Sequence, residues 1–548
     1  MFRSISRHAV LAAMLGAGAM SCVAVASGAP LVTTITVDAN ARRHPVNPLI
    51  YGLNFATAEV LRDLRVPLNR SGGNGASAYN WRIDARNTGQ DWFFESVPVD
   101  SKDVYQYGER FVRLNAQAQV TSMLTIPMIG RVAKLDKDRK PLVSFSVAKY
   151  GKQQGVDGSH LGDAGNGIGP DGAPIRNDPD DASITDDSQS QQERVGQLLR
   201  DTGTDGVRYY MMDNEPSLWH VNHRDIHPAG AHASEVANKV VAYSRAVKAA
   251  DPGARVVAPE EWGWTGYLYS GFDQQYMAAR GQGGTPDRSG ETRGMDYVPW
   301  LLAQWKQAGH PVDVFGLHFY PQGGEFRESN GAAAADSPAI ELARNRSTRD
   351  LWDAGYRDPT WINSVVNLIP MMRRWVDTYY YPGTPIALTE YSWGGDTTMN
   401  GATAQADVLG IFGREGLDIA TRWGALSPEM PVYKAFRLYR NYDGQGAGFG
   451  DTSIADSQGD PDRVSSFAAL RNRDGAMTVV VINKQLDQAA DATIVVENFA
   501  GRGKAEVWQL AGNAISRLPD VDYAGGRVRA SLPRESVTMF VLRGAGRP

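Results

Sequence analysis

Two glutamates in this chain each lie at the end of an apolar, strand-like segment. Glu215 follows the segment Val207–Asp213 and stands directly before Pro216, and Glu390 lies near the end of Pro385–Tyr391. Cleavage of a glycosidic bond needs two carboxyl groups that flank the bond. One is protonated and donates to the leaving oxygen, and the other is ionised and attacks the anomeric carbon. The two glutamates are therefore candidates for such a pair.

Each glutamate also has an ordinary structural interpretation. A glutamate beside a proline is common in the first turn of a helix, and a glutamate that closes a strand can be a surface residue. The helix interpretation does not explain the strand before Glu215, the neighbouring Asn214 or the nearby Trp219. We therefore interpret Glu215 and Glu390 as catalytic, and Asn214 and Trp219 as substrate-binding.

Other polar residues lie at the ends of predicted strands. Arg70 ends one of them, and we expect its charge to keep Glu390 ionised. His318 and Tyr320 occupy alternate positions where another strand ends, so both side chains face the same way. A buried histidine with satisfied hydrogen bonds is the common alternative. We predict that Tyr320 hydrogen-bonds to the nucleophile and that His318 binds a sugar hydroxyl. Arg70 and Tyr320 are expected to contact the substrate as well.

Tryptophans also gather in the segments that follow predicted strands. They are Trp81, Trp92, Trp219, Trp262, Trp264 and Trp393. Sugar rings present C–H faces that pack on aromatic rings, so this set predicts a sugar-binding groove, although any one of them could be core. The adjacent Glu260 and Glu261 must point in different directions and cannot both flank one bond. We interpret Glu260 as a substrate contact or a structural acid.

Eight short apolar segments alternate with helical patterns, which predicts parallel βα units. The segments are Leu49–Asn54, Leu64–Arg70, Val120–Met128, Val207–Asp213, Arg255–Pro259, Val312–Phe319, Pro385–Tyr391 and Ile419–Trp423. Eight such units close into a TIM barrel, whose chemistry sits at the carboxyl ends of the strands. Strands four and seven would then present Glu215 and Glu390 across the barrel mouth.

The remaining segments predict the domain organisation of an α/β protein with a second, smaller domain. Residues 1–26 have the charged, apolar and small-residue regions of a signal peptide. We assign residues 47–450 to the barrel and residues 451–548, with short alternating strands, to a β-sandwich. The strand in residues 27–46 should join the sandwich, because the barrel has no place for a ninth strand.

Composition limits the classes of partner. The net charge of −5 becomes −7 without Arg3 and Arg7 of the leader, which argues against a nucleic-acid partner. The single cysteine, Cys22, lies in the leader, so the mature chain has no disulfide. The leader's apolar run is too short for a membrane span. We expect a soluble, secreted or periplasmic monomer with no membrane partner.

Two segments of the sequence bear on metal binding. His220, His223 and His227 could suggest zinc, but no HExxH motif is present and Pro228 closes the segment. The long segment 151–192 is rich in aspartate and glycine, which leaves open a structural calcium ion, although its spacing does not match an EF-hand loop. We predict no required cofactor.

Seven sequence blocks, taken in order, carry a family resemblance. They are Gly72-Gly73-Asn74, Tyr79-Asn80-Trp81, Leu124-Thr125-Ile126-Pro127-Met128-Ile129-Gly130, Asp213-Asn214-Glu215-Pro216, His223-Arg224-Asp225-Ile226-His227-Pro228, Pro259-Glu260-Glu261-Trp262-Gly263-Trp264 and Thr389-Glu390-Tyr391. With them the chain resembles glycoside hydrolase family 44, the endoglucanases and xyloglucanases with a TIM barrel and a β-sandwich. The resemblance implies that Glu215 is the acid/base and Glu390 the nucleophile.

The expected function is a secreted, endo-acting, retaining β-1,4-glycanase that acts on polysaccharides with a β-1,4-glucan backbone, such as cellulose and xyloglucan. Arg131 stands where an aromatic residue is expected, and residues 75–78 are unusually small, so the preferred polysaccharide stays open. The alternatives are a barrel glycosidase acting on mannan, xylan or arabinoside, or a carbohydrate-binding protein without catalysis. The presence of both Glu215 and Glu390 argues against the last.

Overall fold

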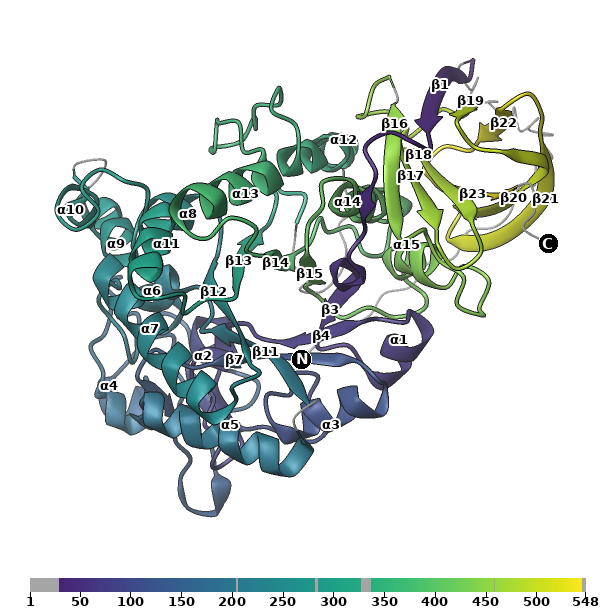
Figure 1. Ribbon diagram of the computed structural model, residues 1–548. Helices are drawn as coiled ribbons and strands as arrows, with labels where there is room; N and C mark the ends of the chain where they lie inside the picture. Colours follow the sequence, from purple (N-terminus) through teal and green to yellow (C-terminus); the bar gives the residue numbers. More distant parts are fainter. Residues whose placement is uncertain (1–28, 204–205, 281–283, 327–336, 458, 545–548) are drawn as a thin grey trace, which may run out of the picture.

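The chain folds into a barrel and an all-β domain that lie side by side (Figure 1). The structure is a computed structural model, and it describes residues 29–203, 206–280, 284–326, 337–457 and 459–544. The predicted leader, residues 1–26, lies outside the described residues.

Eight parallel strands form the closed barrel, in the spatial order β11-β12-β13-β14-β15-β3-β4-β7. In chain order they are β3 (Gly52–Asn54), β4 (Leu68–Ser71), β7 (Thr121–Ile126), β11 (Val207–Met212), β12 (Arg255–Glu261), β13 (Val314–Phe319), β14 (Ile386–Tyr391) and β15 (Ile419–Arg422). Each overlaps one of the eight predicted segments. The predicted fold class, a TIM barrel with a smaller β-sandwich, is confirmed.

The lower part of the barrel is filled by apolar side chains. They are Leu68, Met123, Met211, Val257, Val314, Ala387 and Ile419, which form one buried cluster. Because side chains alternate along a strand, the inward positions nearer the carboxyl ends can carry polar groups instead. The packed lower layer therefore supports a polar upper layer at the barrel mouth.

Each barrel strand is followed by a helix that covers the outside of the barrel (Figure 1). These helices are α1 (Ala58–Asp63), α3 (Glu109–Gln117), α5 (Ser188–Thr202), α7 (Ala233–Ala250), α11 (Tyr297–Gln307), α13 (Leu368–Tyr379), α14 (Met399–Arg414) and α15 (Pro431–Arg440). Their apolar faces pack on the strands, which fixes the strand ends that carry the candidate site.

Further elements lie in the loops between the barrel strands and these helices. The helices are α2 (Asn74–Ser77), α4 (Val147–Tyr150), α6 (Trp219–Asn222), α8 (Trp264–Leu268), α9 (Gly271–Arg280), α10 (Pro286–Ser289) and α12 (Pro338–Ser347). The strands β5 (Ala85–Asn87), β6 (Glu95–Pro98) and β9 (Leu142–Val143) form one small sheet, and β8 (Arg131–Ala133) pairs with β10 (Ser183–Thr185).

The second domain is a β-sandwich with its own buried core. Its strands are β1 (Leu31–Asp38), β2 (His44–Pro45), β16 (Thr452–Ser457), β17 (Val464–Arg471), β18 (Ala476–Asn483), β19 (Ala490–Glu497), β20 (Gly501–Ala511), β21 (Ala514–Tyr523), β22 (Arg527–Leu532) and β23 (Ser536–Gly544). Strand β1 pairs with β16 and with β19, so the N-terminal strand lies in the middle of this sheet. The separate core cluster includes Ile35, Val37 and Phe540.

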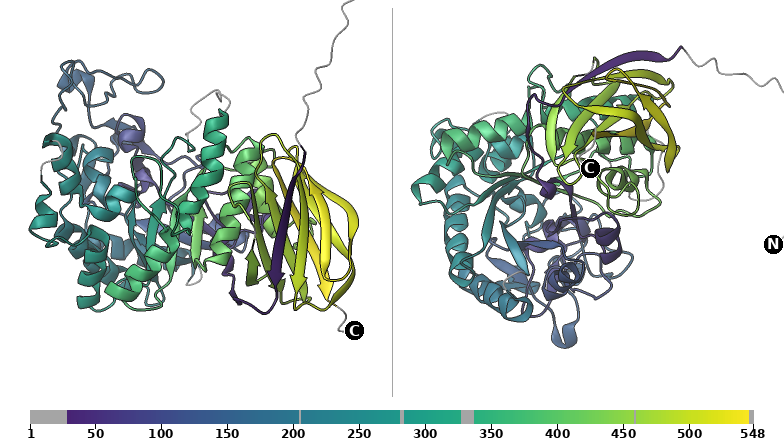
Figure 2. Two further views of the ribbon diagram at one scale, coloured as in Figure 1. Left: turned by 90° about the horizontal axis from the view of Figure 1, so that it is seen from above. Right: turned by 45° about the vertical axis from the view of Figure 1, so that its right-hand side comes forward.

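Helix α14 lies between the two domains, and both views in Figure 2 show the sandwich beside this part of the barrel. Residues 400–413 of α14 are all buried. A Cβ atom built on Gly410 would lie 2.1 Å from the ring of Phe467 in β17, so a larger side chain would separate the helix from the sheet. The domains therefore pack as one tightly fitted unit at this face.

A buried ion pair crosses this interface. Lys484 Nζ, just after β18, lies 2.5 Å from Asp407 Oδ2 in α14, and both side chains are at most 2% exposed. We expect Lys484→Met to lower the free energy of unfolding by about 3–5 kcal/mol, because Asp407 would stay buried without its cation. Urea denaturation measures this loss.

Two further variants test the explanation. Replacing both partners, Lys484→Met with Asp407→Leu, should recover most of the loss. Breaking the exposed pair Arg543–Glu506, in which the side chains are 63% and 25% exposed, should cost less than about 1 kcal/mol. Equal losses from the Lys484 and Arg543 variants would contradict a role for burial.

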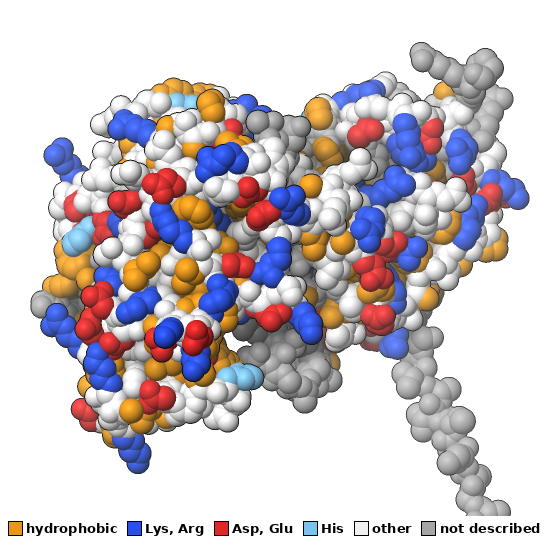
Figure 3. Space-filling view, turned by 90° about the horizontal axis from the view of Figure 1, so that it is seen from below, with side chains coloured by type: hydrophobic (Ala, Val, Ile, Leu, Met, Phe, Trp, Pro, Cys, Tyr) orange, Lys and Arg blue, Asp and Glu red, His pale blue; other side chains and the backbone are white. Residues whose placement is uncertain are grey.

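The surface carries both signs of charge. On the face shown in Figure 3, basic and acidic side chains are interspersed over both domains. Among the described residues, no helix combines the length and the apolar character that a membrane crossing requires.

Candidate active site

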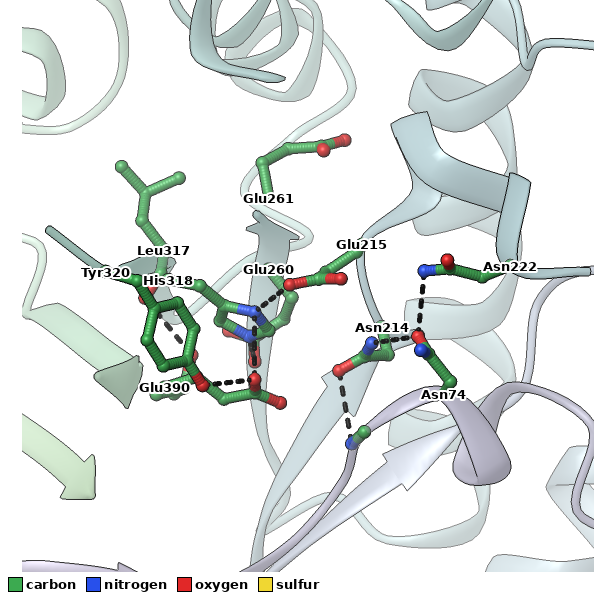
Figure 4. Close-up of polar contacts among 12 residues, drawn as sticks. Asn74, Asn214, Glu215, Asn222, Glu260, Glu261, Leu317, His318, Tyr320 and Glu390 are labelled. Carbon is green, nitrogen blue, oxygen red and sulfur yellow. Dashed lines mark hydrogen bonds and ion pairs between the residues drawn. The ribbon is translucent and has the colours of Figure 1, made fainter. Parts of the chain in front are cut away.

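The carboxyl groups of Glu215 and Glu390 face each other at the carboxyl end of the barrel, with His318 beside both (Figure 4). His318 Nδ1 lies 2.9 Å from Glu215 Oε1 and 3.6 Å from Glu390 Oε2. One oxygen of each carboxyl group and this ring nitrogen all lie within 4.8 Å of one another. The barrel thus brings together two carboxyl groups that are far apart in the sequence.

Glu215 is held by an unusual turn after β11. Asp213 and Glu215 have left-handed backbone conformations, with φ values of 67° and 48°. The Glu215 N–H donates to the carbonyl of Glu260 on the neighbouring strand at 3.0 Å. The buried carboxylate of Asp213 accepts from the backbone N–H groups of Met128 and Ile129. These contacts stabilise a strained backbone that aims Glu215 across the mouth.

Glu390 is surrounded by donors. Arg70 Nη1 donates to Oε1 at 2.7 Å, and the Tyr320 hydroxyl donates to Oε2 at 3.0 Å. Burial alone would raise the pKa of Glu390, but the positive charges of His318 and Arg70 hold that pKa below its ordinary value of 4.5. The surroundings therefore favour the ionised form of Glu390, which is the form a nucleophile needs.

Glu215 has the opposite tendency. Burial raises the pKa of Glu215 above 4.5 and the charge of Glu390 adds to this effect, although His318 opposes it. Burial would lower the pKa of His318, but Glu390, Glu215 and Glu260 together raise it to about 10. The site therefore favours a protonated Glu215, an ionised Glu390 and a charged His318, as acid and nucleophile roles require.

The adjacent glutamates of β12 point in different directions (Figure 4). Glu260 is turned into the barrel, where its Oε2 lies 3.5 Å from Arg70 Nη2 and 3.5 Å from His318 Nε2. Glu261 points away from the pair, and its carboxyl group accepts from the Ser217 hydroxyl at 2.5 Å. Burial raises the pKa of Glu261 to about 8, so this side chain is neutral below that pH.

Three expected substrate contacts are enclosed by protein instead. Arg70, His318 and Glu260 are each fully buried. His318 hydrogen-bonds to Glu215 rather than facing the groove, so its predicted contact with a sugar hydroxyl was wrong. The predictions that Arg70 lies beside Glu390 and that Tyr320 bonds to it agree with the observed contacts. Binding of substrate by Tyr320 stays a prediction.

Asn214 belongs to an amide network at the edge of the site (Figure 4). Its Oδ1 accepts from the Gly73 N–H at 3.2 Å, and its Nδ2 donates to Asn74 Oδ1 at 3.2 Å. Asn222 Nδ2 donates to the same oxygen of Asn74 at 3.0 Å. The network fixes the orientation of Asn214 next to Glu215, and the contact of Asn214 with substrate stays a prediction.

Two of the tryptophans assigned to the groove lie in the core. Trp219 is fully buried and donates through Nε1 to Asp213. Trp393 is 2% exposed and donates through Nε1 to Ser347. Their assignment as substrate platforms was wrong, because the loops that carry them fold inward and cover them. A sequence shows that a tryptophan follows a strand, but not whether its ring faces solvent.

The other tryptophans are at least partly accessible. Trp262 and Trp264 lie half-buried around the start of α8, and Trp264 packs against the core. Their predicted role in substrate binding is untested, as is that of the half-buried Trp81. Trp92 is 42% exposed.

The structure adds aromatic residues that sequence reasoning missed. Trp361 is 54% exposed, and its Nε1 donates to Gln322, a near neighbour of Tyr320. Trp423 follows β15, and its ring packs so closely on Gly73 that a Cβ there would lie 2.5 Å away. Trp423 ends the eighth predicted segment, so its position in the sequence could have identified it. Trp361 lies in an irregular loop, and no sequence pattern could have identified it.

Two groups of described residues bring histidine and carboxylate atoms within 4.8 Å of one another, a spacing that could hold a metal ion. The first is Glu215, His318 and Glu390. The second is His232, Asp287 and Glu291, in which His232 lies 2.7 Å from Asp287, and the Asp287 carboxylate also accepts from Ser270 and the Ala233 N–H. These hydrogen bonds by themselves explain why the side chains of the second group lie close together.

The histidines that follow Glu215 do not converge on one point. His227 contacts Glu235 at 3.0 Å, and His223 lies in the core, where burial lowers its pKa to about 4. In the long loop, the carboxylates of Asp157 and Asp163 accept from backbone N–H groups. The calcium ion considered for this loop stays a prediction.

Comparisons with known proteins relate this chain to polysaccharide-degrading enzymes. Residues 85–323 match the family model of glycoside hydrolase family 44. The chain is 28% identical to the β-mannanase/endoglucanase A of Caldicellulosiruptor saccharolyticus over 528 residues, which cover 88% of this chain and 36% of that protein. The chain thus spans little more than a third of the length of that relative.

Solved structures match almost the whole chain. CelM2, a bifunctional glucanase-xylanase protein from a metagenome library, is 48% identical, with a TM-score of 0.90 over 94% of this chain and 99% of that one. A family 44 xyloglucanase of Paenibacillus polymyxa, solved with xyloglucan, is 28% identical, with a TM-score of 0.76 over 94% of this chain and 100% of that one. Over residues 85–323 the chain matches glycoside hydrolase family 44, and over almost its whole length it shares the fold of solved structures from that family.

Proposed function

We propose that this chain is an endo-acting β-1,4-glycanase that hydrolyses polysaccharides with a β-1,4-glucan backbone and retains the anomeric configuration. Glu390 is the nucleophile and Glu215 the acid/base. The observation that carries this proposal is the closeness of the two carboxyl groups, whose nearer oxygens lie within 4.8 Å of each other and of His318 Nδ1. Retaining enzymes place these groups about 5–5.5 Å apart, whereas inverting enzymes leave about 6.5–9.5 Å for a water molecule.

The reaction proceeds in two steps. A Glu390 oxygen bonds to the anomeric carbon while the glycosidic C–O bond breaks, and the proton of Glu215 goes to the leaving oxygen. Water then attacks the same carbon and gives its proton to Glu215, the ester bond breaks, and the Glu390 carboxylate returns. Arg70 and Tyr320 hold the nucleophile in place throughout, since each hydrogen-bonds to one of its oxygens.

The substrate class is supported by the relatives and by the exposed aromatic residues. One relative is named as a mannanase and endoglucanase, one as a glucanase-xylanase and one as a xyloglucanase. These names refer to enzymes that act on mannan, glucan, xylan or xyloglucan. Trp92 and Trp361 offer exposed ring faces on which sugar units can pack.

A substrate panel with analysis of the products tests the proposal. Soluble cellulose derivative, xyloglucan, xylan and mannan are each incubated with the protein, and product sizes are followed with time. We expect a rapid fall in polymer length on the glucan backbones, and proton NMR should show the β-anomer of the new reducing end first. Early α-anomer would contradict retention, and activity on mannan alone would contradict the substrate class.

The pH dependence of kcat/KM follows from the two opposite shifts. Activity should rise as Glu390 loses its proton below pH 4.5, and fall as Glu215 loses its proton above pH 4.5. The carboxyl groups interact, so the two limbs report the pair rather than single residues. A bell-shaped profile is the expected result. A profile without an alkaline limb would contradict the role of Glu215 as a general acid.

We further propose that the protein is exported, on the strength of the leader-like residues 1–26. Sequencing of the N-terminus of the protein recovered outside the cytoplasm tests this.

A further inference from the structure

Glu260 is a third carboxylate next to Arg70 and His318, and the reaction as described makes no use of it. Its side chain is fully buried. Its contacts with charged groups are those of Oε2 with Arg70 Nη2 and His318 Nε2, at 3.5 Å each. Within the described part of the chain, neither oxygen has a hydrogen-bond partner. A buried anion is costly unless cations compensate it, so these two contacts must account for its presence.

The fold makes specific room for this carboxylate. The pairing of β12 with β13 shifts register between Pro259 and Glu261, and Glu260 itself has a φ of 62°. On β13, a Cβ at Gly316 would lie 2.1 Å from Glu260 Oε1. A bulge, a left-handed residue and a glycine together place one acid inside the barrel, where the regular alternation of a strand would not.

Glu260 compensates the positive charges of two neighbouring groups. Arg70 Nη2 and His318 Nε2 lie only 3.3 Å apart, and both groups are positive when His318 is protonated. In the resting site, Glu390 and Glu260 are both anions and both lie near His318. While Glu215 holds its proton, the positive charges of Arg70 and His318 are therefore balanced by the negative charges of Glu390 and Glu260.

The balance changes during the reaction. When Glu390 becomes an ester it loses its charge, and Glu215 has by then given up its proton. His318 Nδ1, at 2.9 Å, is the charged donor that holds ionised Glu215 ready to accept a proton from water. Of the two anions that faced His318 in the resting site, only Glu260 keeps its charge.

We infer that Glu260 is a positioning residue, an internal counter-anion that keeps His318 charged and directed at Glu215 while the nucleophile is esterified. The inference rests on the proposed function and extends it to the second step. Without the Glu260 anion, repulsion from Arg70 would drive the His318 proton onto Glu215. A protonated Glu215 cannot accept a proton from the attacking water, so the loss should fall on deglycosylation.

The test uses Glu260→Gln in the full-length protein with a dinitrophenyl β-cellobioside. Glycosylation of this substrate needs little acid assistance, so kcat/KM should stay within a few-fold of the unmodified protein. The kcat should fall on the order of 10- to 100-fold. This is less than the full contribution of a general base, because Glu215 is still present but is more often protonated. KM should fall in parallel, and a pre-steady-state burst of dinitrophenol should appear. Azide, which needs no base, should restore turnover and form the β-glycosyl azide.

Two further variants are matched to this one. Glu261→Gln makes the same change at the next residue, which points away from the pair and is neutral below pH 8, so its kinetics should be unchanged. Gly316→Ala should displace the Glu260 carboxylate and reproduce the Glu260→Gln pattern. Circular dichroism and thermal unfolding monitor folding of every variant.

The outcomes separate this inference from the proposed function. Equal losses of kcat and kcat/KM in Glu260→Gln, without azide rescue, would show a merely structural role and overturn the inference. An unchanged kcat would overturn it as well. If Glu215→Ala itself gives neither an intermediate nor a β-azide, the proposed acid/base role fails instead.

Discussion

Replacing Glu390 by glycine should abolish formation of the glycosyl-enzyme and lower kcat on polysaccharide by at least on the order of 10⁴-fold. The side chain that bonds to the anomeric carbon is removed, while Glu215 and the groove stay in place. Arg70 keeps its second carboxylate partner, Glu260, so the buried guanidinium is not left without an anion. Initial rates on xyloglucan and mass spectrometry of the trapped protein measure the effect.

Azide distinguishes the role of Glu390 from a general loss of structure. In Glu390→Gly, azide can enter the space of the lost carboxylate and attack from the same side, so an activated β-glycoside should give the α-glycosyl azide and no β-product. The matched control is Glu261→Gln, which should retain activity. Formation of the β-azide by the Glu390 variant would reverse the two assigned roles.

Replacing Glu215 by alanine should give an effect that depends on the leaving group. Polysaccharide substrates, whose leaving oxygen must be protonated, should lose about 10²- to 10⁴-fold in kcat/KM, the usual contribution of a general acid. Dinitrophenyl glycosides should still form the intermediate, because their leaving group needs no proton. Steady-state kinetics across a series of aryl glycosides measures this slope.

The second step should also change in Glu215→Ala. Water attack loses its base, the intermediate accumulates, and azide should accelerate turnover with formation of the β-glycosyl azide. The alkaline limb of the kcat/KM profile should disappear, because it arises from loss of the Glu215 proton. Full activity of Glu215→Ala on polysaccharide would refute the assignment.

The sequence by itself determined the barrel and the positions of its two carboxylates. The eight strands are short apolar runs whose pattern is local, so each could be recognised without its neighbours. Glu215 and Glu390 follow or end such runs, and the carboxyl ends of barrel strands meet at one mouth. The same reasoning placed Arg70 and Tyr320 beside Glu390, where the structure has them.

Only the tertiary structure decided which of the other side chains face the substrate. Trp219 and Trp393 follow strands as an exposed platform would, yet loop packing buries them, and no local pattern records that packing. Glu260 faces inward because of a register shift and a left-handed backbone conformation in β12, and a shift of one residue turns a side chain to the other face of a strand. His318 is a charged partner of Glu215 rather than a sugar ligand for a related reason. Its protonation depends on three carboxylates, one that follows β11 and two on β12 and β14, which only barrel closure brings together.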